Sequence, residues 1–284
     1  MKQKIVFGAM KNLLCCLAII LPIQFTSNLD TVRNNLSGIS IKKETKQKDI
    51  DKVVLLSLDK DYCDARCYLN ENEKTVSFIT KTFGVNKDLV VEKLVEINSQ
   101  GKYDINNIGR LTDSNGALIN YGSFERGLIE YMFKYVEENS QNVDNTHVPY
   151  TGSREYVENL IKYFTKYYPE VDYLTVISIG AAESGYYTAS GMLSVNNVYG
   201  GMGNGGLIRY KNIEYGILSY VRYLANYYYA QGLNTVESIG YKYCPSIDAN
   251  GNKVTSPHWL NLVYRAKGVY ANTNNDIKVD ALVD

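Results

Sequence analysis

The segment from Val171 to Glu183 constrains the fold of this 284-residue chain more than any other stretch. The helix that it predicts is apolar on nearly every side, through Leu174, Val176, Ile177, Ile179, Ala181 and Ala182. A helix that is apolar all round is buried in the core of a domain. We therefore expect this helix to be the centre of a helical domain, with the other helices packed around it.

Glu183 is the acidic residue at the end of this apolar segment. A carboxyl group between a protein interior and a cleft is partly desolvated, which raises its pKa and keeps it protonated near neutral pH. A general acid requires a protonated carboxyl group. The alternative is a solvated acid at a helix end. Position alone favours that alternative, because the helix dipole disfavours acids at a C-terminus.

A glycine-rich loop with interleaved tyrosines follows the acid. Its glycines permit tight turns and the close approach of a polymer. The G-x-G-x-x-G spacing from Gly201 to Gly206 matches a dinucleotide-binding fingerprint, but the surrounding sequence predicts no βαβ unit and has no acid at the ribose offset. We therefore reject nucleotide binding and expect a hairpin turn at Asn204-Gly205.

Further helices with apolar stripes are predicted around the central one. Ser153 and Asn212 are suitable N-caps for two long helices, and Pro257 suits the first position of the last helix. Asn234 and Glu237 resemble a capping box for a short helix that ends near Gly240. The expected inward stripe of the last helix comprises Trp259, Leu262, Val263, Ala266 and Val269.

A separate helical region is predicted in residues 53–140. Gly84 is placed to end one helix, Asn86 to cap the next, which carries Leu89, Val90, Leu94 and Ile97, and Ser123 to cap a third. This region contains no chemical motif, so we expect it to support the fold or to dock a membrane-protein partner. A run of Asn, Ser, Thr, Gly and Pro over residues 140–153 marks the boundary between the two regions.

Residues 1–28 have the pattern of a targeting segment. The apolar run from Leu13 to Ile23 is short for a spanning helix and suits an export signal, although no pair of small residues marks a clean cleavage site. An uncleaved anchor over residues 5–25 is the alternative. Residues 29–52 are charged and predict a solvated linker. The expected location is the cell wall, the extracellular space or the outer face of the cytoplasmic membrane.

The composition excludes some partners and points to others. Thirty basic residues balance thirty acidic ones, so the net charge draws the chain neither to nucleic acid nor to an anionic membrane. The 26 tyrosines suit half-buried helix surfaces and carbohydrate grooves alike, because tyrosine has a flat apolar face and a polar tip. Cys63 and Cys67 could form a local disulfide or remain thiols, and two histidines with Cys244 supply no cluster for zinc.

The order of motifs in the second half resembles a known family. The motifs are a buried helix ending in Glu183-Ser184-Gly185, an Asn196-Asn197-x-Tyr199-Gly200 turn, an Arg209-Tyr210-x-x-x-Glu214 helix entry, Ile239-Gly240, Tyr243-Cys244-Pro245 and a final helix with Trp259. Over about residues 150–270, this set is similar to the catalytic domain of bacterial peptidoglycan N-acetylglucosaminidases, glycoside hydrolase family 73 of the lysozyme-like superfamily.

The resemblance implies a mainly α fold. A lysozyme-like catalytic domain with a small hairpin flap would occupy residues 148–275, and residues 276–284 would form a tail. The implied activity is that of a secreted autolysin, an endo-β-N-acetylglucosaminidase that cleaves the glycan strands of peptidoglycan with no metal or cofactor.

The resemblance also assigns residues. The family's catalytic glutamate matches Glu183, its late tyrosine matches Tyr243, and its turn matches Asn196, Asn197, Tyr199 and Gly200. Tyr187 and Trp259 are further candidate substrate contacts, although packing is the simpler explanation for a tryptophan on an inward stripe. Most glycosidases use two carboxylates, and the sequence identifies no second one.

Three nearby acids have structural explanations. Glu214 suits the first turn of a helix, Glu237 a cap and Asp248 a loop. The N-acetyl group of the substrate could replace the second carboxylate, with Tyr243 orienting it or the water. A muramidase or a lytic transglycosylase on the same fold, and a non-catalytic wall-binding or scaffold module, remain alternatives.

Overall fold

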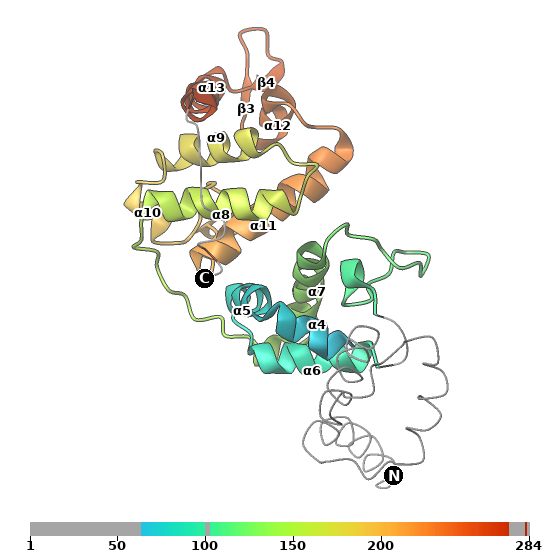
Figure 1. Ribbon diagram of the computed structural model, residues 1–284. Coiled ribbons are helices and arrows are strands. Elements are labelled where there is room, and N and C mark those ends of the chain that lie inside the picture. The colour runs from blue at the N-terminus through green and yellow to red at the C-terminus, as the bar shows by residue number, and fades with distance from the viewer. Residues whose placement is uncertain (1–63, 100–102, 273–281, 283–284) are drawn as a thin grey trace, which may run out of the picture. The chain divides into compact units, whose positions relative to one another are not determined.

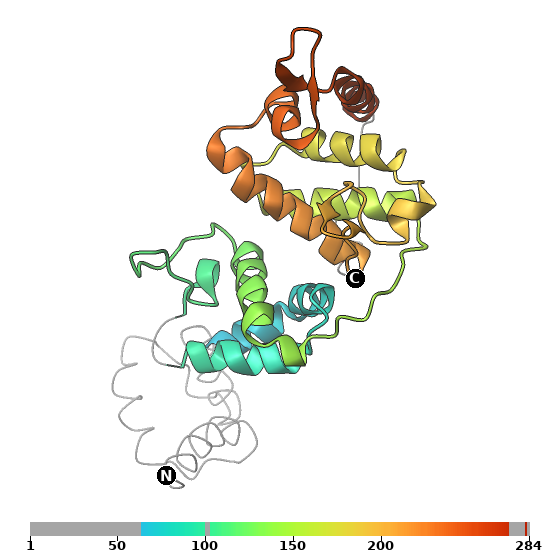
Figure 2. The ribbon, with the colours of Figure 1, turned by 180° about the vertical axis from the view of Figure 1, so that it is seen from behind.

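The computed structural model describes residues 64–99, 103–272 and 282, and these residues belong to one compact unit. This part is mainly helical, which confirms the predicted class (Figures 1 and 2). None of the helices in these ranges is both long enough and apolar enough to span a bilayer. The targeting segment, the charged linker and Cys63 lie outside the described residues, so the predictions for them stay predictions.

The first group of helices follows the predicted hairpin and the helix after it. Its elements are α4 (Ala65–Glu71), α5 (Glu73–Thr82), α6 (Lys87–Ile97), the 3₁₀ turn η1 (Ile105–Asn107), α7 (Phe124–Glu138) and the 3₁₀ turn η2 (Ser140–Asn142). The predicted caps are confirmed: Gly84 has a φ of 61° after α5, and Asn86 and Ser123 cap α6 and α7. Leu89 is 47% exposed and does not belong to the inner stripe, because Val90 and Leu94 face the core one turn apart.

The second group surrounds the apolar segment. Its helices are α8 (Arg154–Lys166), α9 (Tyr173–Ser184), α10 (Ser190–Leu193), α11 (Ile213–Tyr227), the 3₁₀ turn η3 (Tyr229–Gln231), α12 (Val236–Tyr243) and α13 (Pro257–Asn272). Two short antiparallel hairpins connect them: β1 (Met202–Gly203) with β2 (Gly206–Leu207), and β3 (Pro245–Ile247) with β4 (Lys253–Thr255). The first hairpin turns at Asn204-Gly205, as predicted.

Helix α9 is the central helix of this group. Val176, Ile177 and Ile179 are fully buried, and α8 and α13 both pack against the helix (Figure 1). The Asp172 side chain caps its first turn by accepting from the backbone N–H groups of Leu174 and Thr175. The prediction of a buried central helix is therefore confirmed.

Two details of the later helices differ from the prediction. The capping box of α12 is formed by Thr235 and Ser238, and the helix continues past Gly240 to Tyr243. The Thr235 side chain accepts from the backbone N–H of Ser238, and the Ser238 side chain accepts from the backbone N–H of Thr235. The observed capping box therefore lies one residue later than the predicted pair of Asn234 and Glu237.

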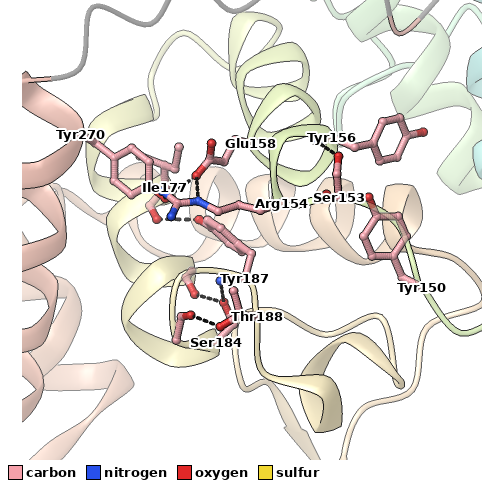
Figure 3. A network of polar contacts seen from close by, with 12 residues as sticks. Tyr150, Ser153, Arg154, Tyr156, Glu158, Ile177, Ser184, Tyr187, Thr188 and Tyr270 are labelled. Carbon is pink, nitrogen blue, oxygen red and sulfur yellow. Dashed lines mark hydrogen bonds and ion pairs between the residues drawn. The ribbon is translucent and has the colours of Figure 1, made fainter.

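In α13, the inward stripe ends on Tyr270, while Val269 is 44% exposed. Tyr270 faces inward because its hydroxyl donates to Glu158 Oε1 on α8 over 2.6 Å. The same oxygen of Glu158 accepts from Arg154 Nε (Figure 3).

The two groups of helices are joined by packing and polar contacts. The fully buried ring of Phe83 meets the ring of Tyr215 on α11 edge to face, with centroids 5.3 Å apart. Arg126 on α7 makes a bidentate ion pair with Glu170, with N–O distances of 2.6 and 3.0 Å. The side-chain amide of Asn212 donates to the carbonyl of Thr82 over 3.1 Å. The first group therefore buttresses the N-terminal end of α11.

Candidate active site

Glu183 lies in the last turn of α9, where the helix leaves the core. Gly185 ends the helix in the left-handed conformation, with a φ of 57°. Tyr186 and Tyr187 continue in that conformation, with φ values of 58° and 61°. Bulky residues rarely adopt it, and such positions cost on the order of 1–3 kcal/mol each. The surrounding structure must hold this turn in place.

Tyr187 supplies part of that hold. Its side chain is buried, its hydroxyl donates to the carbonyl of Ile177 over 2.6 Å, and its backbone N–H donates to Ser184 Oγ over 3.0 Å (Figure 3). The ring is therefore anchored to α9, beside the turn that carries Glu183. Tyr187 is buried in the interior of the domain, so it supports the turn after α9 and does not line the cleft.

The carboxyl group of Glu183 is held by Trp259. The indole N–H of Trp259 donates to Oε1 over 2.7 Å. An indole nitrogen can only donate, so Oε1 must act as the acceptor in this bond. A carbonyl oxygen accepts a hydrogen bond better than a hydroxyl oxygen does, so this bond favours the neutral form whose proton is on Oε2. That oxygen faces Gly200, where a Cβ atom, if the glycine carried one, would lie 3.0 Å from it.

Burial raises the pKa of Glu183 above the ordinary carboxyl value of 4.5, and the hydrogen bond from Trp259 lowers it in part. The position of Glu183 at the C-terminal end of α9 also favours a raised pKa, because the helix dipole disfavours a negative charge there. The protonated form that a general acid needs is thus favoured by the site.

A cleft of about 630 Å³ opens beside this carboxyl group. Tyrosines and the glycine-rich loop form most of its wall, which comprises Glu183, Gly200, Gly201, Met202, Ile208, Tyr210, Ser219, Tyr220, Tyr223, Tyr228, Lys242, Tyr243 and Cys244. Among these described residues, Glu183 is the only carboxylic acid. The cleft therefore presents one acid against an aromatic surface.

Asn196 and Asn197 form the base of the loop that borders the cleft. Asn196 has a φ of 57°, a conformation that asparagine tolerates better than most residues, and its amide donates to the carbonyls of Val148 and Tyr210. The Asn197 amide donates to the carbonyls of Gly201 and Ile208 over 2.8 and 2.9 Å, one on each side of the β1–β2 hairpin. Both side chains are buried and hold the flap in shape.

Tyr199 and Tyr243 are connected to each other. The hydroxyl of Tyr243 donates to the backbone carbonyl of Tyr199, and the buried ring of Tyr199 stacks on that of Tyr220 with centroids 3.6 Å apart. Burial, and next the negative charge of Glu183, raise the pKa of Tyr243 well above its ordinary value. Tyr243 therefore stays protonated, and its proton is directed to the loop that carries Gly200.

The structure brings the predicted residues together in two layers. Glu183, Gly200 and Tyr243 line the cleft, whereas Tyr187, Asn196, Asn197, Tyr199 and Trp259 lie behind it. Trp259 is only 5% exposed and reaches the site through its N–H group.

Sequence reasoning did not assign Tyr223, Tyr228 or Lys242 to the cleft. Neither spacing nor a motif marks these residues, and their place depends on how α11 and α12 pack.

The three acids with structural explanations are accounted for. Glu214 lies in the first turn of α11 and accepts from the Tyr156 hydroxyl over 2.6 Å. Glu237 lies in the first turn of α12 and accepts from the hydroxyl of Tyr264. Asp248 accepts from backbone N–H groups of its own hairpin loop. None of the three lines the cleft of Glu183.

A second cavity of about 670 Å³ lies between α5 and the start of α11. Its acids are Asp144 and Glu214, and its cations are Lys81, Lys87 and Lys211. Glu214 is already bound by a tyrosine hydroxyl, and burial is not the leading influence on Asp144, whose pKa is lowered by its hydrogen bonds to Thr146. This cavity is therefore a poorer candidate for acid catalysis than the cleft.

No family model, curated protein or solved structure matches this chain. The assignment of a function therefore rests on the geometry of the site.

Trp259→Phe is expected to shift the pH dependence of any reaction that Glu183 catalyses. The hydrogen bond from Trp259 lowers the pKa of Glu183, so its removal raises that pKa and moves the alkaline limb of the kcat/KM profile to higher pH. We also expect kcat/KM at the optimum to fall about tenfold, the effect of losing one hydrogen bond to a carboxyl group.

The measurement is a pH profile of kcat/KM for that reaction. Tyr264→Phe on the same helix is the matched control, because its hydroxyl contacts Glu237 outside the cleft. An alkaline limb of the Trp259 variant that coincides with the wild-type limb would contradict a role in positioning Glu183.

Proposed function

We propose that this chain is a cell-wall hydrolase that cleaves the glycan strands of peptidoglycan, as an endo-β-N-acetylglucosaminidase with Glu183 as its general acid. The observation that carries the proposal is the single carboxyl group of raised pKa at the wall of a tyrosine-lined cleft. The lysozyme-like fold belongs to the same proposal. It is supported by the buried central helix that ends in the acid and by the hairpin flap beside it.

In the proposed reaction, Oε2 of Glu183 donates its proton to the glycosidic oxygen as the bond to the leaving sugar breaks. Trp259 keeps Oε1 as an acceptor, so that the proton is presented on the other oxygen. Gly200 allows the glycan to approach, because a side chain at this position would crowd Oε2. Tyr243 fixes the loop that bears Gly200 through its bond to Tyr199.

The positive charge that develops on the sugar requires a partner. Two-carboxylate glycosidases use a second acid for this step, and the described wall of the cleft offers none. The N-acetyl oxygen of the substrate can attack the same carbon and form a cyclic intermediate that water then opens, with the carboxylate of Glu183 accepting the proton of the water. Substrate assistance therefore suits this site.

The lack of a second carboxylate in the described wall also favours one alternative on the same site. A lytic transglycosylase needs no activated water, because the muramyl residue attacks its own reacting carbon through its 6-hydroxyl group. Both reactions use Glu183 first as acid and then as base, but they leave different ends on the glycan.

Identification of the new ends tests the proposal. Purified peptidoglycan is digested with the whole chain, the products are reduced with borohydride, and the terminal sugars are identified by mass spectrometry. We expect N-acetylglucosaminitol. Muramitol would indicate a muramidase, an anhydromuramyl end would indicate a transglycosylase, and the absence of new ends would leave a wall-binding module.

A further inference from the structure

The cleft beside Glu183 has one cation in its described wall, Lys242 of α12. The remaining residues of that wall are glycines, apolar side chains, tyrosines, a serine and a cysteine. When Glu183 is protonated, as its raised pKa favours, the wall carries a net positive charge. Such a cleft attracts an anionic ligand more strongly than a neutral one of the same shape.

The hydrogen bonds of the Lys242 ammonium group go to uncharged acceptors, and the side chain is exposed. The ammonium group donates to the carbonyl of Tyr227 over 3.1 Å and to Gln231 Oε1 over 3.3 Å, and it lies 5.0 Å from the centre of the Tyr228 ring. Within the described chain, no carboxylate forms a salt bridge with it. An ammonium group has three N–H donors, so one donor and the full charge remain for a ligand.

An aromatic cluster connects this cation to the cleft. The Tyr228 ring near the ammonium group meets the ring of Tyr223 edge to face, with centroids 5.6 Å apart, and Tyr223 lines the cleft and is 42% exposed. Exposed aromatic rings suit the apolar faces of sugar rings, and their polar tips can remain in water. The wall therefore offers a surface for a sugar near an exposed positive charge, which fits a glycan whose sugars carry acidic substituents.

We infer that Lys242 makes the cleft selective for anionic glycan, by binding a carboxylate of the substituents that branch from the muramyl residues of peptidoglycan. This inference rests on the proposed function and adds the part of the substrate that the site selects. Tyr223 provides the neighbouring sugar surface. Neutral polymers of N-acetylglucosamine lack the group that Lys242 binds.

The test compares native peptidoglycan with peptidoglycan whose carboxylates have been converted to neutral amides by carbodiimide coupling. Lysis and sedimentation binding are measured for the wild type, K242Q and K242R. We expect K242Q to lose affinity for native wall by about two- to fivefold, the range of a solvent-accessible ion pair, and to bind amidated wall as the wild type does. K242R should retain the preference for native wall, and added salt should weaken the preference of the wild type.

K253Q is the matched control. Lys253 lies on β4, over the ring of Tyr241 of α12, and it does not line the cleft. K253Q therefore removes the same charge as K242Q without changing the wall of the cleft. Equal losses of K242Q and K253Q, an unchanged preference in K242Q, or equal losses on native and amidated wall would each overturn the inference.

Binding is repeated in the Glu183→Gln background, which separates this inference from the proposed function. If the chain releases no new glycan ends but K242Q still removes a preference for native wall, the proposed hydrolysis is wrong and the proposed selectivity stands. If Glu183→Gln abolishes lysis and K242Q leaves the preference intact, only the selectivity is wrong.

Discussion

Replacing Glu183 by glutamine is expected to lower peptidoglycan lysis by about 10²- to 10⁴-fold, the usual contribution of a general acid. Glutamine keeps the shape of the side chain and can still accept the N–H of Trp259, but it cannot donate a proton to a glycosidic oxygen. Release of new reducing ends from purified wall measures the effect. Binding to the same wall, measured by sedimentation, should persist.

Glu237→Gln is the matched control for this experiment. Glu237 is an acid in the first turn of α12 that accepts from the hydroxyl of Tyr264 outside the cleft. Its replacement should leave lysis within about twofold of the wild type, as expected for a change away from the reacting groups. Undiminished lysis by the Glu183 variant would remove the central residue of the proposed mechanism.

The same variant has a second expected effect, on stability. Because burial raises the pKa of Glu183 above 4.5, ionising this group in the folded protein costs free energy that the unfolded chain does not incur. This cost is absent below the ordinary pKa and grows as the pH rises from 4.5 through the raised value. Thermal unfolding at several pH values should therefore show Glu183→Gln gaining stability over the wild type toward neutral pH.

Gly180→Ala is expected to destabilise the protein by about 1–3 kcal/mol, the usual cost of overpacking a core. A Cβ atom on Gly180 would lie 2.7 Å from the hydroxyl of Tyr187 and 2.8 Å from the ring of Tyr199. Both tyrosines are almost completely buried and cannot move aside. The change should also reduce lysis, since Gly180 and Glu183 share the last turns of α9.

Gly268→Ala, on α13, is expected to have the opposite effect on stability. A Cβ atom there meets nothing within 4 Å, so alanine adds helix propensity without a clash and should stabilise the protein by up to about 1 kcal/mol. Urea unfolding of both variants gives the comparison. Equal stability of the two variants would show that the contact between α9 and the two tyrosines is not as close as the structure indicates.

Much of the local structure could be predicted from the sequence because caps and apolar spacing act over a few residues. Ser123, Ser153 and Asn212 each cap the helix assigned to them, since a side-chain oxygen beside an apolar stripe satisfies the first free N–H groups whatever the fold. The same logic misplaces the cap of α12 by one residue, because Asn234 and Thr235 are both good caps and the sequence does not choose between them.

The candidate site was predictable in part. Apolar residues on all sides of the segment before Glu183 required a buried helix, and a buried helix that ends in an acid places a carboxyl group at the edge of the core. The partner of that acid was not predictable. Trp259 is 76 residues further along the chain, and its position on an inward stripe indicated packing without indicating that its N–H would meet Oε1.

The sequence by itself determined the helical class and the central place of residues 171–182, because both follow from local periodicity. It also determined the choice of Glu183 as the candidate acid, through the order of motifs that the second half of the chain shares with a known family, since the position of Glu183 alone favoured a solvated acid. Only the tertiary structure decided which predicted residues meet the cleft and which stand behind it. It buried Tyr187, Tyr199, Asn196 and Asn197, and it brought Tyr223 and Lys242 into the wall. The reason is physical: a tyrosine or an asparagine satisfies its polar group equally well inside a core or in a groove, and only the packing of distant helices selects one of the two.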